Sequence, residues 1–349
     1  LRPLRLCAFA LKKLPTNLYS AKSVALLDQI AINDCGIPGY TLMRRAGQAV
    51  LDVLLAHYAD AKTILVLCGA GNNAGDGYVL ARLAQAHGLD VRVVSMIDPG
   101  KLRGDARQAW QHWQECGETV TYRKEFTADA EVIIDALLGT GLTREVEDDW
   151  KQLINTVNQS GIPVISVDIP SGLNADTGVI SGAAINANHT VCFIGLKKAM
   201  FPGSGKACSG ELSFDALGLP AGISESVEPD AELLCHSSQW ALSPRRHDIH
   251  KGNNGHVLIV GGNYGMPGSV ILAARAALRS GSGLVSVVTR NEHINAVVAA
   301  CPECMVHGSA NGEIDPGLLE KADYIAVGCG LGSDAWAQRL LYLVLDSTI

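Results

Sequence analysis

Three polar turns contain the residue types that could act on a nucleotide, and the first is rich in glycine. Gly69-Ala70-Gly71 leads into a polar segment that runs from Asn72 to Asp76. The glycines partly match the G-x-G-x-x-G/A pattern, which places a pyrophosphate on a helix N-terminus. Such a turn needs neither two adjacent amides nor a carboxylate, so Asn72, Asn73 and Asp76 indicate a more specialised site. The alternative is a plain turn in which Asn72 and Asp76 cap a helix.

The second and third turns each carry an aspartate directly after an apolar segment. Residues 135–145 begin with Asp135, and their glycine-rich loop carries threonines and Arg144 that could meet phosphate. Residues 167–174 contain Asp168, followed by Pro170 and Ser171. The alternative for this segment is an Asx turn followed by a proline turn.

The elements around these turns predict an α/β fold. Short apolar segments alternate with helical patterns, which implies crossover connections and a mainly parallel sheet covered on both faces. The carboxyl ends of parallel strands form the ligand-binding edge of such a sheet, so we expect the three turns to meet in one crevice. The predicted strands are 63–68, 91–96, 132–134, 164–167 and 190–194, and the predicted helices include 77–87 and 105–116.

The length of 349 residues predicts two domains. We place the first at 1–218, a connection rich in Pro, Ser, Glu and Gly at 219–248, and the second at 249–349. The second predicts strands at 256–260, 284–289 and 323–327 and helices at 269–280 and 335–345. It offers only about 100 residues, a small part of a doubly wound domain, so we expect it to be incomplete.

Composition excludes several classes of partner. The net charge of −7 argues against nucleic acid, which needs a basic surface. No apolar segment reaches the roughly 18–20 residues that would span a bilayer. Ten scattered cysteines in a chain of this size favour a reducing cytoplasm. The first 27 residues are basic and contain no acid, so a targeting segment is the alternative there. A homo-oligomer is compatible with all of these properties.

The order and spacing of the three turns resemble the NAD(P)H-hydrate epimerase family over about residues 20–218. The segments 185–187 and 193–197 extend the resemblance. Residues 250–256 and 281–285 are similar to the start of the companion dehydratase, which has a ribokinase-like fold. Epimerase followed by dehydratase is the arrangement of bifunctional bacterial enzymes. The resemblance therefore implies a three-layer Rossmann-like epimerase domain before a truncated, ribokinase-like α/β dehydratase domain.

The resemblance also implies a reaction and the residues that serve it. The epimerase interconverts the R and S forms of hydrated NADH or NADPH at C6, with Asp168 as the acid and base. A potassium ion would be held by Asn73, Asp135 and Ser171, whose oxygens are the hard donors that such a cation takes. The residues implied in substrate binding are Asn72, Asn73, Ala74, Gly75, Asp76, Gly139, Thr140, Gly141, Leu142, Thr143, Arg144, Glu145, Asp168, Ser269 and Gly330.

The chain departs from the family pattern at three positions. Ala74 stands where the family usually has Gly, and a positive φ there would add about 1–2 kcal/mol of strain. Ser269 and Cys329 stand where the dehydratase usually has Ala and Pro. The dehydratase's late glycine-rich turn with its acid is not found before Ile349. We therefore expect dehydration of the S form, with ADP or ATP and Mg²⁺, only in the full-length parent.

Two other classes of protein remain as alternatives. An NAD(P)-dependent oxidoreductase of the Rossmann type would need an acid about 20 residues after the glycine-rich turn, and Asp98 is the nearest candidate. A non-catalytic nucleotide-binding scaffold, as in proteins of RNA turnover, would be expected to lose the acid and the cation ligands. The presence of Asp76, Asp135 and Asp168 together with Ser171 argues against a scaffold.

Overall fold

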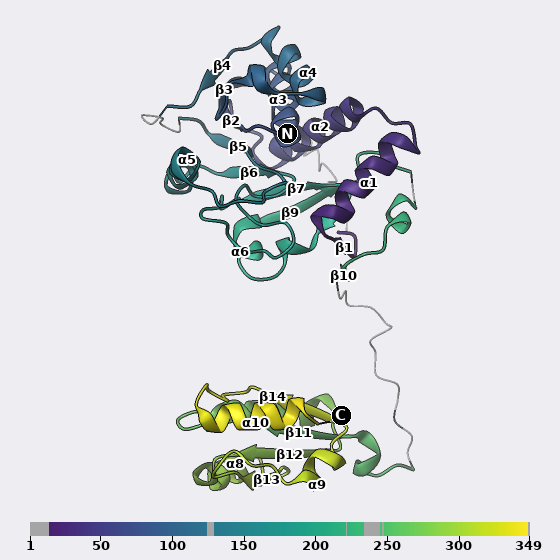
Figure 1. Ribbon diagram of the computed structural model, residues 1–349, viewed down its shortest axis with the longest axis vertical. Coiled ribbons are helices and arrows are strands. Elements are labelled where there is room, and N and C mark those ends of the chain that lie inside the picture. The colour runs from purple at the N-terminus through teal and green to yellow at the C-terminus, as the bar shows by residue number, and fades with distance from the viewer. Residues whose placement is uncertain (1–13, 124–128, 221, 234–244, 246–247, 348–349) are drawn as a thin grey trace, which may run out of the picture. The chain divides into compact units, whose positions relative to one another are not determined.

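The computed structural model describes residues 14–123, 129–220, 222–233, 245 and 248–347. The chain divides into two compact units, residues 1–236 and 237–349 (Figure 1). The start of the basic N-terminal segment and most of 234–247 lie outside the described residues. Each unit is an α/β structure with a parallel sheet, as the sequence predicts.

A parallel seven-stranded sheet forms the centre of the first unit. Its strands are, in spatial order, β4 (Thr119–Thr121), β3 (Asp90–Ser95), β2 (Thr63–Cys68), β5 (Val132–Ala136), β6 (Val164–Val167), β7 (His189–Phe193) and β9 (Glu211–Asp215). From β2 the chain first builds outward to β3 and β4, and then returns to place β5 on the other side of β2. The order therefore reverses between β2 and β5, where open α/β sheets bind ligands.

Helices cover both faces of this sheet. The first face carries α1 (Ala21–Asn33), α2 (Gly39–His57), α3 (Asn72–Ala86) and α4 (Gly104–Gln114), and the second carries α5 (Asp148–Gln159). Each uses one apolar stripe, such as Leu153, Ile154 and Val157 of α5, which are fully buried or nearly so. Alternate residues of β2 separate accordingly: Ile64 and Val66 face α2 and α3, whereas Leu65 and Leu67 face α5.

Shorter elements complete the first unit. A small sheet joins β1 (Asn17–Tyr19) to β8 (Leu196–Lys197) in parallel and to β10 (Ala231–Glu232) in antiparallel orientation. Part of the predicted connection, β10, therefore pairs with the start of the first unit. The remaining elements are η1 (Pro99–Lys101), η2 (Lys198–Met200), α6 (Gly205–Ser209) and η3 (Ile223–Ser226).

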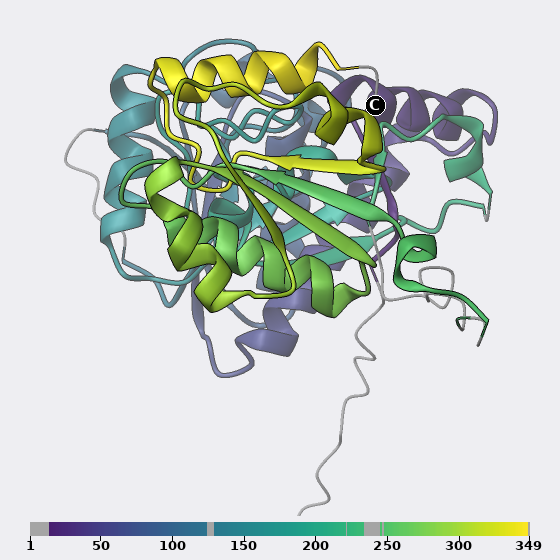
Figure 2. The same cartoon turned by 90° about the horizontal axis from the view of Figure 1, so that it is seen from below.

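The second unit has a parallel four-stranded sheet in the order β13 (Met305–Gly308), β12 (Leu284–Thr289), β11 (His256–Val260), β14 (Tyr324–Val327). One face carries α9 (Pro316–Lys321) and α10 (Ala335–Leu345), and the other carries α7 (Pro267–Ser280) and α8 (Ile294–Ala300). Figure 2 shows α10, in yellow, on one side of this sheet and the green helices on the other. Two short turns, η5 (Lys251–Asn254) and η6 (Asn291–His293), complete it.

None of the described helices is both long and apolar enough to cross a membrane.

Candidate functional site

A cavity of about 600 Å³ opens at the carboxyl ends of β2, β5 and β6, beside the point where the strand order reverses. All three polar turns contribute to its wall, together with α1, α2 and the segment from Phe193 to Lys197. The volume falls within the range of about 300–1,000 Å³ that is usual for small-molecule sites. The cavity is therefore large enough for part of a nucleotide.

The first turn is shaped by a close approach of two strand ends. The amide of Gly69 donates to the Ala136 carbonyl at 3.1 Å, and a Cβ at Gly69 would lie 1.7 Å from the Leu137 carbonyl oxygen. Only glycine fits at this position. α3 then begins at Asn72, five residues earlier than its sequence pattern predicts, with Gly71 as N-cap and no side-chain cap. The amides of its first turn are the anion-binding groups of a helix N-terminus.

Ala74 and Gly75 are not among the residues that line the cavity, because they lie on the part of α3 that packs into the core. Ala74 is fully buried, and its φ is not positive, so the strain that we predicted at this position is absent. A Cβ at Gly75 would lie 2.6 Å from the Met43 side chain, so this glycine allows α3 to pack against α2. Asn72, Asn73 and Asp76, by contrast, do line the cavity.

Asn73, Asp135 and Ser171 meet around the backbone of Leu138, and of these three residues Asn73 lines the cavity. Ser171 Oγ donates to Asp135 Oδ1 at 2.5 Å and also lies 3.1 Å from the Leu138 carbonyl oxygen. Asn73 Nδ2 donates to the same carbonyl at 3.4 Å. Asp135 is fully buried, and its hydrogen-bond donors among the described residues are neutral: Ser166, Ser171 and the Leu137 amide. Burial raises the pKa of Asp135, and the hydrogen bonds from Ser171 and Ser166 offset part of that rise.

Asp168 follows β6 and forms an ion pair with Lys197. The Asp168 side chain is 17% exposed, whereas that of Lys197 is 1% exposed. Asp168 Oδ1 also accepts from the Phe193 amide at 3.2 Å, and Lys197 Nζ donates to the Phe193 carbonyl at 3.1 Å. Burial alone would lower the pKa of Lys197, but the nearby Asp168 and Cys192 raise it above its ordinary value. The lysine therefore stays charged and holds the carboxylate in place.

The backbone at this point is held in uncommon conformations. Asp168 has a φ of 66° and Ile194, which also lines the cavity, has a φ of 62°. Asp is one of the few residues that adopt left-handed backbone readily, whereas a β-branched residue such as Ile does so only where its surroundings force it. Such residues cluster at sites where function fixes the backbone.

Two further carboxyl groups in the lining of the cavity, those of Asp76 and Asp28, have a raised pKa. Burial raises the pKa of Asp76 well above its ordinary value, and the charges of Asp168 and Asp28 add to that rise. Burial and the charge of Asp168 likewise raise the pKa of Asp28, while Lys197 opposes the change. The cavity therefore combines a carboxylate held by a lysine with acids that keep their protons to higher pH. This is how paired carboxyl groups acquire separate acid and base roles.

The segment 139–144 forms one wall of the cavity, and Arg144 is exposed there. Glu145 lies instead at a neighbouring hollow of about 250 Å³, together with Glu147 and Trp150. Asp98, the acid that an ordinary dehydrogenase would use, is not among the residues lining the cavity. Its Oδ1 accepts from the Gly100 amide at 2.9 Å, which makes it a local turn residue.

In the second unit, Ser269 and Gly330 lie together beyond the ends of β11 and β14. Ser269 Oγ donates to the carbonyls of Met266 and Cys329 at 2.7 and 3.0 Å. Gly330 has a φ of 62°, and a Cβ there would lie 2.1 Å from Ser269 Oγ. Neither belongs to the cavity of the first unit.

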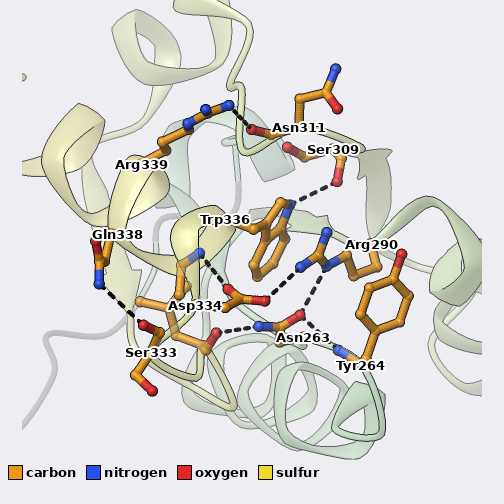
Figure 3. Close-up of polar contacts among 12 residues, drawn as sticks. Asn263, Tyr264, Arg290, Ser309, Asn311, Ser333, Asp334, Trp336, Gln338 and Arg339 are labelled. Atoms are coloured by element: carbon orange, nitrogen blue, oxygen red, sulfur yellow. Dashed lines mark hydrogen bonds and ion pairs between the residues drawn. The ribbon is translucent and has the colours of Figure 1, made fainter.

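Arg290 connects the loops that follow the strands of this second sheet (Figure 3). Its guanidinium lies 4.2 Å from the ring centroids of both Tyr264 and Trp336. It donates to Asn263 Oδ1 at 2.9 Å and to Asp334 Oδ2 at 3.0 Å. The loops beside Ser269 and Gly330 are thus cross-linked by one buried cation.

Comparison with known proteins agrees with this two-part organisation. Residues 39–199 match the family model for the YjeF-related protein N-terminus, and residues 257–348 match the one for NAD(P)H-hydrate dehydratase. Over 336 residues, or 96% of this chain, it is 42% identical to the bifunctional NAD(P)H-hydrate repair enzyme Nnr of Coxiella burnetii, covering 69% of that protein. The chain belongs to the bifunctional NAD(P)H-hydrate repair enzyme family.

Two further relatives show the extent of the similarity. The bifunctional NAD(P)H-hydrate repair enzyme Nnr of Escherichia coli is 40% identical over 95% of this chain, which covers 64% of that relative. The chain therefore spans about two thirds of the length of these family members. A crystal structure of the yeast protein YNL200c matches 63% of this chain and 97% of its own, with a TM-score of 0.52 and 21% identity, which shows a shared fold.

These matches confirm the predicted family and correct one part of the prediction. The dehydratase match over residues 257–348 means that this domain is present in the chain, whereas we expected a truncated one. Membership of the repair-enzyme family also sets aside the oxidoreductase and scaffold alternatives.

Sequence reasoning missed three charged residues. Lys197 lies 29 residues after Asp168, and Arg290 lies 44 residues before Asp334, so neither pair forms a local motif. Asp28 is one acid on an amphipathic helix, which usually marks a solvated position. The available signal for Lys197 was a lysine three residues after the end of the predicted apolar strand 190–194.

Proposed function

We propose that the first unit interconverts the R and S forms of hydrated NADH or NADPH at C6 of the nicotinamide ring. The observation that carries this proposal is Asp168, held by buried Lys197 at the cavity wall beside Asp76, whose pKa is raised. The hydrate carries a hydroxyl at the carbon next to the ring nitrogen. Its epimerisation needs a group that gives and takes a proton, and a cavity that accepts both epimers.

Asp168 is proposed as that proton shuttle. In one direction Asp168 would pass a proton to the hydroxyl, the C6–oxygen bond breaks so that the hydroxyl leaves as water, and the ring nitrogen supplies the electron pair of an iminium. Water then adds to the other face of C6 and loses a proton to Asp168. Asp76 would hold a second exchangeable proton nearby, since its pKa is raised. Positioned acid–base catalysis of this kind contributes about 10²–10⁴-fold.

Substrate binding would use the remaining residues of the cavity. The first turn of α3, with Asn72 and Asn73, offers free amides to a pyrophosphate. Arg144 and the hydroxyls of Thr140 and Thr143 would cover the phosphates from segment 139–145. Ala74 and Gly75 would then act through the shape of α3 rather than by direct contact, and Glu145 would lie at the edge of the site.

A potassium ion is proposed at Asn73, Asp135 and Ser171. Their chemistry fits such an ion, because the Asp135 carboxylate and the Ser171 hydroxyl lie beside the Leu138 carbonyl, and the Asn73 side-chain amide, which also carries an oxygen, reaches the same carbonyl. Asp135 is buried without a cationic hydrogen-bond partner among the described residues, and buried charges are normally paired or bound to a metal. The ion would supply a positive charge that holds three loops together, while the protein's own groups move the proton.

For the second unit we propose a share in dehydrating the S form in the whole protein, with ADP or ATP and Mg²⁺. Ser269 and Gly330 would contact the substrate there, on loops that Arg290 connects. A cytoplasmic location and a homo-oligomeric state remain predictions.

One experiment tests the epimerase proposal directly. One purified hydrate epimer is incubated with the protein and with its Asp168→Asn variant, and the other epimer is followed by chromatography. We expect accelerated interconversion with the parent protein only. Equal rates in the two samples and in buffer would refute the proposal. Hydride transfer between NADP⁺ and small alcohols would instead return the oxidoreductase alternative.

A further inference from the structure

Two histidines and a glutamate meet at the amino-terminal edge of the seven-stranded sheet, at the opposite ends of the strands from the cavity. One ring nitrogen of His57, one of His189 and a carboxylate oxygen of Glu211 all lie within 4.8 Å of one another. His57 is the last residue of α2, while His189 and Glu211 are the first residues of β7 and β9. Three elements that are distant in sequence therefore bring their ends together here.

The register of the sheet fixes this arrangement. His189 and Glu211 are paired positions on adjacent parallel strands, so their side chains leave the same face. On that face of β7 follow Val191 and Phe193, which pack in the core with residues of α2. The end of α2 thus reaches the level of His189, and the two imidazole centroids lie 4.1 Å apart.

His189 has a buried ring nitrogen that lacks a hydrogen-bond partner. The residue is 8% exposed, and its Nδ1 finds no donor or acceptor within hydrogen-bonding distance among the described residues. The nearest carboxylate oxygen, Glu211 Oε2, is 3.9 Å away. Buried polar atoms are nearly always satisfied, so an unpaired one beside two other ligand-type groups points to a species between them.

We propose that His57, His189 and Glu211 bind a divalent transition-metal ion, for which zinc is the best fit. Two imidazoles and one carboxylate form a ligand set that zinc takes, at about 2.0–2.2 Å from each donor atom. Two ligands of one tetrahedral ion at such distances are about 3.3 Å apart. The 3.9 Å between His189 and Glu211 is close to this value, and the exposed side chains of His57 and Glu211 are free to close the rest.

The ion would act on the stability of the first unit and not on the reaction. His189 and Phe193 are the ends of β7, and a rise of about 3.3 Å per residue separates them by roughly 13 Å. Phe193 lines the cavity. Bound to residues of α2, β7 and β9, the ion would join a helix to two strands at the edge opposite the cavity. The proposal is therefore independent of the proposed epimerase function.

Metal titration of the whole chain tests the site. The protein is treated with chelator, its accessible thiols are alkylated, and it is titrated with Zn²⁺ by calorimetry and with Co²⁺ by visible absorption. We compare the parent with His57→Ala and Glu211→Gln, which alter exposed side chains, and with His87→Ala as matched control. His87 is likewise an exposed histidine, at the end of α3. Circular dichroism checks that all four proteins fold.

We expect one high-affinity zinc ion per chain in the parent and in His87→Ala. Loss of a group that merely supports a ligand costs about 10–100-fold in metal affinity, so loss of a ligand should cost at least 100-fold in the other two variants. Zinc should also raise the thermal unfolding temperature of the parent and His87→Ala only. The proposal is overturned if all four proteins bind zinc with the same stoichiometry and affinity, or if none binds it.

Discussion

Replacing Asp168 by Asn separates the catalytic role of this residue from its structural one. Asn suits the site because Asp168 has a φ of 66°, and Asn tolerates this backbone whereas Ala would add about 1–2 kcal/mol of strain. The introduced amide oxygen can still accept from Lys197 and from the Phe193 amide. What the substitution removes is the negative charge and the capacity to carry a proton.

The structure allows the loss of stability to be estimated. Breaking a buried ion pair costs about 3–5 kcal/mol, and the Lys197 side chain is only 1% exposed. The hydrogen bond from charged Lys197 to the amide oxygen that the Asp168→Asn substitution introduces offsets about 1.5–3 kcal/mol of this loss. We therefore expect the free energy of unfolding of the first unit to fall by about 2 kcal/mol. Activity should fall by about 10²–10⁴-fold, with nucleotide binding largely retained.

The double variant Asp168→Asn/Lys197→Met provides the control. It removes the buried lysine that the single substitution leaves unpaired, so most of the stability should return, but the activity should not. Urea unfolding followed by fluorescence, and the epimer assay, give the two measurements. A single variant that keeps more than about a tenth of its activity, or a double variant that regains it, would refute Asp168 as the shuttle.

The pH dependence gives a second check on this pair. The folded pKa of Lys197 is raised above its ordinary value of 10.5, so the stability due to the ion pair is fully present below pH 10.5 and is lost as pH rises through the folded pKa. In the Asp168→Asn variant, burial is no longer opposed by that carboxylate, so the pKa of Lys197 falls. As pH rises through that lowered pKa, the variant loses its unfavourable buried charge and becomes more stable, while the stability of the parent stays the same up to pH 10.5. The difference in stability between variant and parent should therefore narrow as the pH approaches 10.5.

Three other outcomes follow from the cavity. Because the pKa of Asp76 is raised, its carboxyl group opposes folding increasingly as pH rises above 3.8. The Asp76→Asn substitution should therefore raise the free energy of unfolding at neutral pH while lowering activity. A variant that unfolds at a lower urea concentration than the parent would contradict this. Replacing potassium by tetramethylammonium should reduce epimerisation in the parent, and Asp135→Ala should lose most of that dependence; equal rates in both salts would exclude the cation. The Gly69→Ala substitution places a Cβ 1.7 Å from the Leu137 carbonyl oxygen and should destabilise the protein by at least the roughly 1–3 kcal/mol that is usual for overpacking. The Gly71→Ala substitution should not, because a Cβ at Gly71 would have no neighbour within 4 Å. Chemical unfolding of the two variants compares their stabilities.

The four central strands of the sheet, β2, β5, β6 and β7, were predictable because they are almost entirely buried, whereas the more exposed edge strands β4 and β9 were not predicted. Ile64 to Cys68 and Val132 to Ala136 are buried at every position, so each is a continuous apolar segment whose polar residues come at its end. The rule that parallel strands bind ligands at their carboxyl ends then placed Asn72, Asp135 and Asp168 at one edge.

Other features depend on contacts that no local pattern encodes. The prediction began α3 five residues too late, because four of the first five residues of this helix, Asn72, Asn73, Gly75 and Asp76, are weak helix formers. Lys197 belongs to the two-residue strand β8, which is held in place by pairing with β1 near the start of the chain. This pairing positions Lys197 beside Asp168. The Arg290 cluster likewise assembles aromatic rings that are 72 residues apart in the chain, Tyr264 and Trp336.

The left-handed backbone of Asp168 limits how this position can evolve. Codons for Asn and Gly are each one base change from those for Asp, and both residues tolerate a φ of 66°. The commonest mutations that the fold accepts here are thus ones that remove the carboxylate. A gene copy released from selection for activity can lose the chemistry at this site early while the encoded chain still folds. Descendants that keep the fold without the reaction should accordingly carry Asn or Gly at this position more often than Ala or Val.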